Sequence, residues 1–149
     1  MRNINVNNSL GYTDTSLVIA LSGFIAGALL GMVMGLWSFD GPLSPPTFLG
    51  GYADTPRRLL RLGHIACFGT GILNLLLSRE LPRLGLSPNR VRLAALAMNS
   101  ANISLPLTLV LASLYAPLKY ALPVSVFSAF LALLIAAVGS AALIRKQEV

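Results

Sequence analysis

Four long stretches without charged residues constrain this chain more than any other feature of its sequence. Residues 15–39, 62–78, 93–118 and 120–144 contain no Asp, Glu, Lys or Arg. Three of these stretches exceed the roughly 20 residues that an α-helix needs to cross a bilayer. The pattern therefore predicts an all-α integral membrane protein, built as a bundle of four transmembrane helices.

The composition of the chain agrees with a membrane location. Charged residues make up 11% of the sequence, whereas ordinary soluble domains carry about 25%. The length of 149 residues leaves no room for a separate soluble module beside four spans, so residues 1–149 are expected to form a single membrane domain. The net charge of +6 comes mostly from residues at the ends of the spans, which favours lipid headgroups over nucleic acid as the partner.

Helix boundaries follow from the apolar stretches together with local start and stop signals. Residues 14–16 are candidate amino-terminal caps for the first helix. Thr55 with Pro56, and Ser87 with Pro88, each pair a cap with a proline at the first helical position, where the missing N–H costs nothing. These signals define four expected helices: 16–37, 56–78, 88–115 and 118–144.

Basic residues are distributed unequally between the two expected sides of the membrane. One side holds seven of them: Arg2, Arg79, Arg83, Arg90, Arg92, Arg145 and Lys146. The other side holds four: Arg57, Arg58, Arg61 and Lys119. Because Lys and Arg accumulate on the cytoplasmic side, both termini are expected in the cytoplasm of a plasma membrane protein. The Gly- and Pro-rich loop 38–55 is then expected outside.

Glycine recurs at every fourth position of the first span, at Gly23, Gly27, Gly31 and Gly35. This spacing places the glycines on one helix face, where the missing side chains let another helix backbone approach closely. The pattern, typical of a glycine zipper, predicts helix packing inside the bundle, with homodimerisation as the alternative and a glycine-lined pore as a third possibility. Ala20 is expected to lie off this face.

Polar residues form a stripe along the second expected helix. They are separated by steps of three or four residues, which keeps them on one face of a helix in a left-handed bundle: Arg57, Arg61, His64, Cys67, Gly71, Asn74 and Ser78. Polar groups are costly in hydrocarbon and normally face the interior of a bundle. The stripe should therefore point at other helices.

The third expected helix carries Asn99 and Asn102, which match this stripe. At 1.5 Å per residue, Asn74 lies about 7 Å and Asn99 about 10 Å from the inner ends of their helices, so their amides are expected to pair. On the outer half, His64 lies level with Thr108 and Ser125, its expected hydrogen-bond partners. We call the six residues Cys67, Asn74, Asn99, Asn102, Thr108 and Ser125, together with His64, the polar seam.

Two functions for His64 remain open from the sequence. Interhelical polar residues usually satisfy one another, which favours a structural role. Alternatively, His64 ligates a haem whose propionates meet Arg57 or Arg61, or it holds a quinone. One histidine cannot supply both axial ligands of a bis-His haem, so a homodimer or a partner subunit would have to supply the second. His64 and Cys67, even with Met98, fall short of a metal site, and none is expected.

No span contains Asp or Glu, so the sequence offers no carboxylate relay of the kind that transporters use. The histidine also lacks a membrane acid with which to form a hydrolytic triad. Enzymatic activity is not expected. The sequence favours a non-enzymatic accessory or interaction subunit, either as a homodimer or within a larger membrane complex. The alternative is a haem- or quinone-binding electron-transfer subunit that uses His64 and the cluster Arg57, Arg58 and Arg61; a small transporter or channel ranks third.

Overall fold

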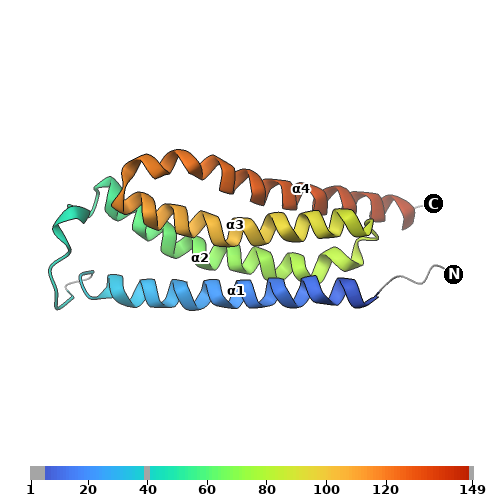
Figure 1. Cartoon of the computed structure of the whole chain (residues 1–149), viewed down its shortest axis with the longest axis horizontal. Coiled ribbons are helices and arrows are strands. Elements are labelled where there is room, and N and C mark those ends of the chain that lie inside the picture. Colours follow the sequence, from blue (N-terminus) through green and yellow to red (C-terminus); the bar gives the residue numbers. More distant parts are fainter. Residues whose placement is uncertain (1–5, 39–40, 148–149) are drawn as a thin grey trace.

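The computed structural model describes residues 6–38 and 41–147, which form four long helices and no strand. The long helices are α1 (Val6–Gly35), α2 (Thr55–Glu80), α3 (Pro88–Leu114) and α4 (Leu122–Gln147) (Figure 1). Three short 3-10 helices lie between them: η1 (Thr47–Leu49), η2 (Leu81–Arg83) and η3 (Ala116–Ala121). Among the described residues, four helical segments are long and apolar enough to cross a membrane. The predicted all-α fold, with four helices long and apolar enough to span a membrane, is thus confirmed.

The first helix starts earlier than the sequence predicted. The expected caps at residues 14–16 lie inside α1, which begins at Val6. The segment before them contains no proline, and a helix that is already nucleated extends at little cost per residue. With 30 residues, α1 is about 45 Å long at 1.5 Å per residue, which exceeds the hydrocarbon thickness. The part that suits a membrane span is Asp14–Gly35.

The starts of the other helices differ from the prediction only in detail. Ser87 caps α3 as expected. The cap of α2 is Asp54 rather than Thr55, and its carboxylate oxygen Oδ2 accepts a hydrogen bond of 2.7 Å from the backbone N–H of Gly51. The last helix begins at Leu122 because the preceding residues wind as η3.

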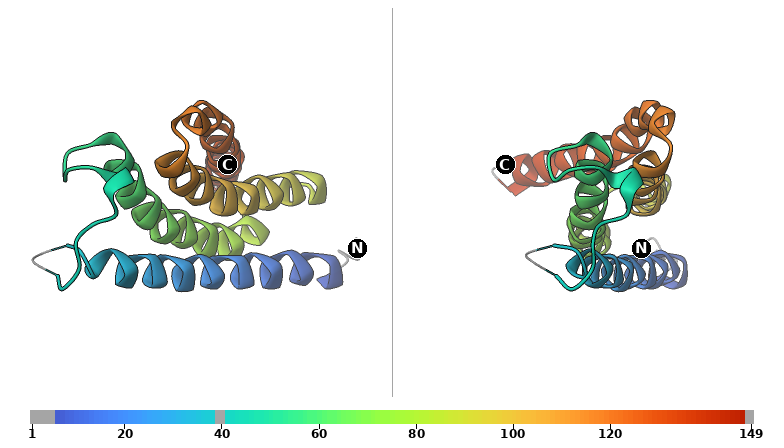
Figure 2. Two further views of the ribbon diagram at one scale, coloured as in Figure 1. Left: turned by 60° about the vertical axis from the view of Figure 1, so that its left-hand side comes forward. Right: turned by 90° about the vertical axis from the view of Figure 1, so that its left-hand side faces the viewer.

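The helices are arranged as a row rather than as a closed ring. α2 packs against both α1 and α3, and α1 also touches α3, whereas α4 packs against α3 and η3. In every view α1 and α4 lie on opposite sides of the α2–α3 pair (Figures 1 and 2). The structure therefore consists of a three-helix core with α4 attached to one side of it.

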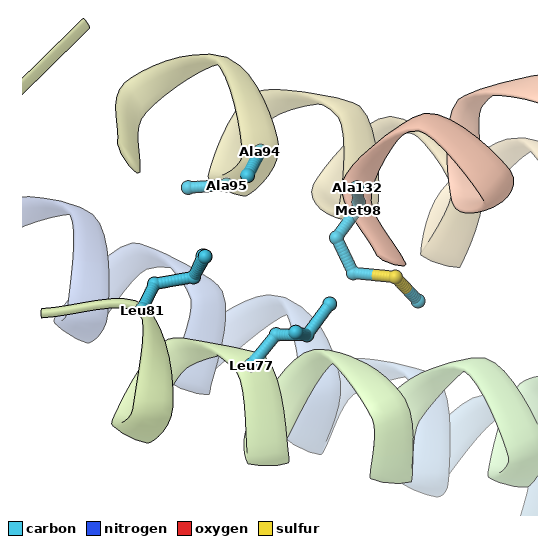
Figure 3. Close-up of a cluster of buried hydrophobic side chains, with 6 residues drawn as sticks. All are labelled: Leu77, Leu81, Ala94, Ala95, Met98 and Ala132. Atoms are coloured by element: carbon cyan, nitrogen blue, oxygen red, sulfur yellow. The ribbon is translucent and has the colours of Figure 1, made fainter. Parts of the chain in front are cut away.

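Two clusters of buried apolar side chains hold the ends of this assembly together. The first joins α2, η2, α3 and α4 (Figure 3): Leu77, Leu81, Ala94, Ala95, Met98 and Ala132. The second joins Met34 and Leu60 to Leu49 of η1, so the loop between α1 and α2 is folded back onto the helices. Leu49 is only 1% exposed.

The first residue of α1 and the last residue of α4 lie at the same end of the molecule, together with the turn between α2 and α3 (Figure 1). This arrangement follows from four spans in alternating directions. Arg2, which was counted among the basic residues on the side of the termini, lies outside the described residues.

Candidate functional site

The glycine face of α1 lies against α2. A Cβ atom at Gly27 would lie 2.9 Å from Cβ of Cys67. At Gly23, a Cβ would lie 3.4 Å from the carbonyl oxygen of Cys67. Gly35 has no atom within 4 Å of such a Cβ and takes no part in the contact. The close approach of α1 to α2 therefore depends on the first three glycines of the series, the third being Gly31.

The second helix contributes two further glycines to these contacts: Gly71, which belongs to the stripe predicted to point at other helices, and Gly63, which was not predicted. A Cβ at Gly71 would lie 2.6 Å from Cε1 of Phe24 and 3.3 Å from the carbonyl oxygen of Ala20. Ala20 is fully buried, so the expectation that it lies off the packing face is wrong. On the other side of α2, a Cβ at Gly63 would lie 2.8 Å from Cγ2 of Val110 in α3. Both neighbours of α2 are thus packed through glycine.

His64 extends from α2 onto the glycine face of α1. Its Nδ1 atom lies 2.8 Å from the carbonyl oxygen of Gly27. A carbonyl has no proton, so Nδ1–H is the donor. The imidazole edge lies directly over Gly31, where a Cβ would be 2.6 Å from Cε1. The ring also meets Phe68 edge-on, at a centroid distance of 5.3 Å.

This orientation corrects the predicted partners of the histidine. His64 was expected to bond Thr108 or Ser125, but its hydrogen bond goes to α1. The polar stripe of α2 is wide, and it lies between two neighbouring helices, so its two edges face different partners. His64 and Cys67 lie on the α1 edge, whereas Thr108 is half-buried on α3 and Ser125 is buried on α4.

The predicted pairing of amides between α2 and α3 is confirmed. Nδ2 of Asn74 donates to Oδ1 of Asn99 over 2.9 Å. The same Nδ2 atom lies 3.4 Å from the carbonyl oxygen of Ser16 in α1. Asn74 is 1% exposed, so this amide bridges all three core helices in the interior. The amide pair was predicted from the sequence, whereas the contact with Ser16 was not.

Asn102 lies one turn from Asn99 on α3 and is joined to Thr70 of α2. Thr70 was not predicted from the sequence, although it lies on α2 between Cys67 and Asn74. The Thr70 hydroxyl lies 2.7 Å from the carbonyl oxygen of Ala66 and 2.7 Å from Oδ1 of Asn102. One hydroxyl donates a single proton. The buried Nδ2 atom of Asn102 has no partner. Turning this amide by 180° resolves both points: Nδ2 donates to Thr70, whose hydroxyl donates to Ala66.

The arginines at the other end of α2 bind the loop that precedes the helix. Arg57 donates to the carbonyl oxygen of Trp37 over 3.2 Å, and Arg61 donates to the carbonyl oxygen of Tyr52 over 3.1 Å. The Arg61 guanidinium also lies 3.9 Å from the centroid of the Tyr52 ring, a cation–π contact. Arg58 is exposed. Two of the three basic side chains in this cluster therefore hold the loop in place.

No group of three or more His, Cys, Asp or Glu side chains comes together within the described part of the chain. Cys67 is buried with a free thiol. Met98 belongs to the apolar cluster at the end of the molecule where the termini lie, away from His64 on the α1 side of α2. The structure therefore does not bring His64, Cys67 and Met98 together.

Comparisons with protein-family models, with curated proteins and with solved structures found no match to this chain.

Proposed function

We propose that this chain is a non-enzymatic accessory subunit of a membrane complex, and that α4 is the helix that binds the partner. The observation that carries the proposal is the packing of α4, which contacts the rest of the chain mainly through α3 and η3. Its buried residues Ser125, Ala132 and Gly139 are small and recur every seven residues, on one narrow stripe. In the most apolar stretch of α4, only 11% of the residues are buried, compared with 44% in the corresponding stretch of α3.

The remaining faces of α4 are apolar and uncovered. Phe127 is 63% exposed and Phe130 is 55% exposed. Aromatic side chains provide large contact areas in protein interfaces, and helices in membranes associate through such packing. A second membrane protein that packs against these phenylalanines would cover them, while α3 holds α4 in position.

The polar seam supports a structural role because most of its hydrogen-bonding groups find partners on neighbouring helices of the same chain. Asn74 pairs with Asn99, Thr70 with Asn102, and His64 with the backbone of α1. Groups that satisfy one another fix helix register, at a net gain of about 0.6 kcal/mol per contact on average. The distribution of Lys and Arg supports a cytoplasmic membrane with both termini inside.

A second function is favoured by one detail of His64. Because Nδ1–H donates to the Gly27 carbonyl, Nε2 carries the lone pair. This tautomer is the one that metal-ligating histidines adopt when a backbone carbonyl orients them. Haem ligation by His64, with the second axial ligand from a partner, therefore remains the alternative proposal; quinone binding at Nε2 uses the same lone pair.

Purification of the tagged chain from its native membrane in mild detergent tests both functions in one preparation. We expect a native mass larger than that of a monomer or homodimer, with a second protein in constant ratio. Replacing Phe127 and Phe130 by Ala should release that protein. The matched control replaces Ile25 and Leu29, which are 63% and 54% exposed on α1, by Ala and should leave the complex intact.

Two results contradict the accessory role. A chain that elutes only as a monomer or homodimer, unchanged by the α4 substitutions, has no partner subunit bound through this helix. A Soret band in the purified protein that disappears in His64→Gln establishes the haem alternative instead.

A further inference from the structure

A cavity of about 210 Å³ lies at the end of the molecule that carries the termini. It is open to the outside and is bordered by the turn between α2 and α3 on one side and by the last turns of α4 on the other. Its lining combines apolar side chains with one cation: Leu84, Gly85, Leu86, Ser87, Arg90, Val138, Gly139, Ala142 and Leu143. None of these residues belongs to the polar seam.

Two glycines shape this cavity. Gly85 has a backbone φ of 61°, a left-handed conformation that suits glycine, and it reverses the chain between η2 and α3. Across the cavity, Gly139 of α4 is buried, and a Cβ there would lie 3.0 Å from Cδ2 of Leu86. The Leu86 side chain thus rests on the α4 backbone and forms one wall.

The polar part of the lining has the chemistry of an anion site. Ser87 is the amino-terminal cap of α3, yet its hydroxyl makes no capping hydrogen bond, so it can bond to a ligand. Arg90 follows in the first turn of the same helix, where the helix dipole also favours negative charge. The only ion pair among the described residues joins Arg83 to Glu80. Arg90 therefore has no carboxylate partner within residues 6–38 and 41–147.

The remaining lining is apolar, and within it Val138 lies deepest, about 10 Å from the end of the α4 span at 1.5 Å per residue. Val138, Ala142 and Leu143 belong to the last turns of the candidate span Ala116–Arg145. The Ser87 end falls between the spans Thr55–Arg83 and Pro88–Leu114, which is the level of the headgroups. A ligand that matches both parts needs an anionic head at the interface and an apolar chain that enters the hydrocarbon.

We propose that this cavity is a binding site for one acidic phospholipid of the leaflet on the terminal side. Arg90 and the Ser87 hydroxyl hold its phosphate, and the start of an acyl chain lies against Val138 and Ala142. Two further basic side chains at this end raise the local concentration of acidic lipid: Arg79 and Arg145. Free phosphate would match only the polar part and leave the apolar wall unused.

Native mass spectrometry of the full chain, titrated with phosphatidylglycerol or with phosphatidylcholine of the same acyl chains, tests the proposal. We expect wild-type protein to retain one phosphatidylglycerol molecule with clear preference over phosphatidylcholine. Arg90→Ala should weaken that binding about tenfold, the size of losing one charge-assisted hydrogen bond. Ala142→Phe should weaken it similarly by filling the apolar wall.

The matched controls are Arg92→Ala and Ala141→Phe, which alter exposed neighbours that do not line the cavity, and both should bind lipid like wild type. Equal losses for Arg90→Ala and Arg92→Ala would mean a diffuse basic surface and would overturn the site. Unchanged binding in Ala142→Phe would also overturn it, because the acyl chain would not occupy the cavity. The site would also be overturned if inorganic phosphate protected the protein against heat as strongly as the lipid does.

Discussion

Replacing Gly31 by leucine is expected to force α1 away from α2 and to lower the free energy of unfolding by about 3 kcal/mol, the upper end of the cost of overpacking. The imidazole of His64 occupies the space that a side chain at Gly31 needs, since even a Cβ would lie 2.6 Å from Cε1. The ring cannot retreat freely because its Nδ1 is bonded to Gly27 and Phe68 closes its other side. Thermal unfolding in detergent, followed by circular dichroism, measures the loss.

Gly35→Leu is the matched control for this prediction. It lies on the same glycine series, but no atom lies within 4 Å of a Cβ there, so we expect a change of less than about 0.5 kcal/mol, as at ordinary surface positions. The smaller substitution Gly31→Ala should also destabilise, and adding His64→Ala should recover part of that loss by removing the ring. If Gly31→Leu and Gly35→Leu unfold at the same temperature, α1 does not pack on α2 through these glycines.

The second large effect is expected at the amide pair between α2 and α3. Replacing Asn74 by Leu leaves the buried Oδ1 of Asn99 without its donor, and an unsatisfied buried polar group costs about 1–3 kcal/mol. Replacing both amides by Leu removes the unpaired group as well. The double variant should therefore be more stable than the sum of the two single losses predicts, by a coupling of up to about 2 kcal/mol.

A double-mutant cycle measured by denaturant unfolding in mixed micelles provides this coupling energy. The single variant Asn99→Leu completes the cycle, and Ile72→Ala serves as a control because its side chain is 51% exposed on α2 outside the seam. Strictly additive losses at Asn74 and Asn99 would show that the two amides do not share a hydrogen bond.

The amide pair was predictable because a short connection fixes the register of α2 against α3. The turn between them contains η2 and a few further residues, so depth counted from the helix ends transfers from one helix to the next. Depth counted in the same way gave the wrong partners for His64, because depth does not specify the direction in which a side chain points around its helix. That direction depends on where α1 packs, and the loop 38–55 is too long to fix the position of α1 from sequence.

The position of α4 was also beyond the sequence. Apolar residues surround α4 on all sides, and its small residues Ser125, Ala132 and Gly139 become a recognisable stripe only once α3 is seen against them. The contacts of Arg57 and Arg61 with the loop likewise involve carbonyl oxygens of Trp37 and Tyr52, and backbone acceptors give no signal in a sequence. The membrane spans, in contrast, follow from apolar length alone.

Cysteine accessibility tests most directly the central claim, that this chain crosses the membrane four times with both termini inside. In a Cys67→Ser background, single cysteines replace Ala53 before α2 and Asn89 at the start of α3, both exposed positions at opposite ends of the α2 span. The account predicts that an impermeant thiol reagent labels Ala53→Cys on intact cells and labels Asn89→Cys only after permeabilisation. Labelling of both cysteines from the outside would show that α2 does not cross the membrane, and the reverse pattern would place the termini outside.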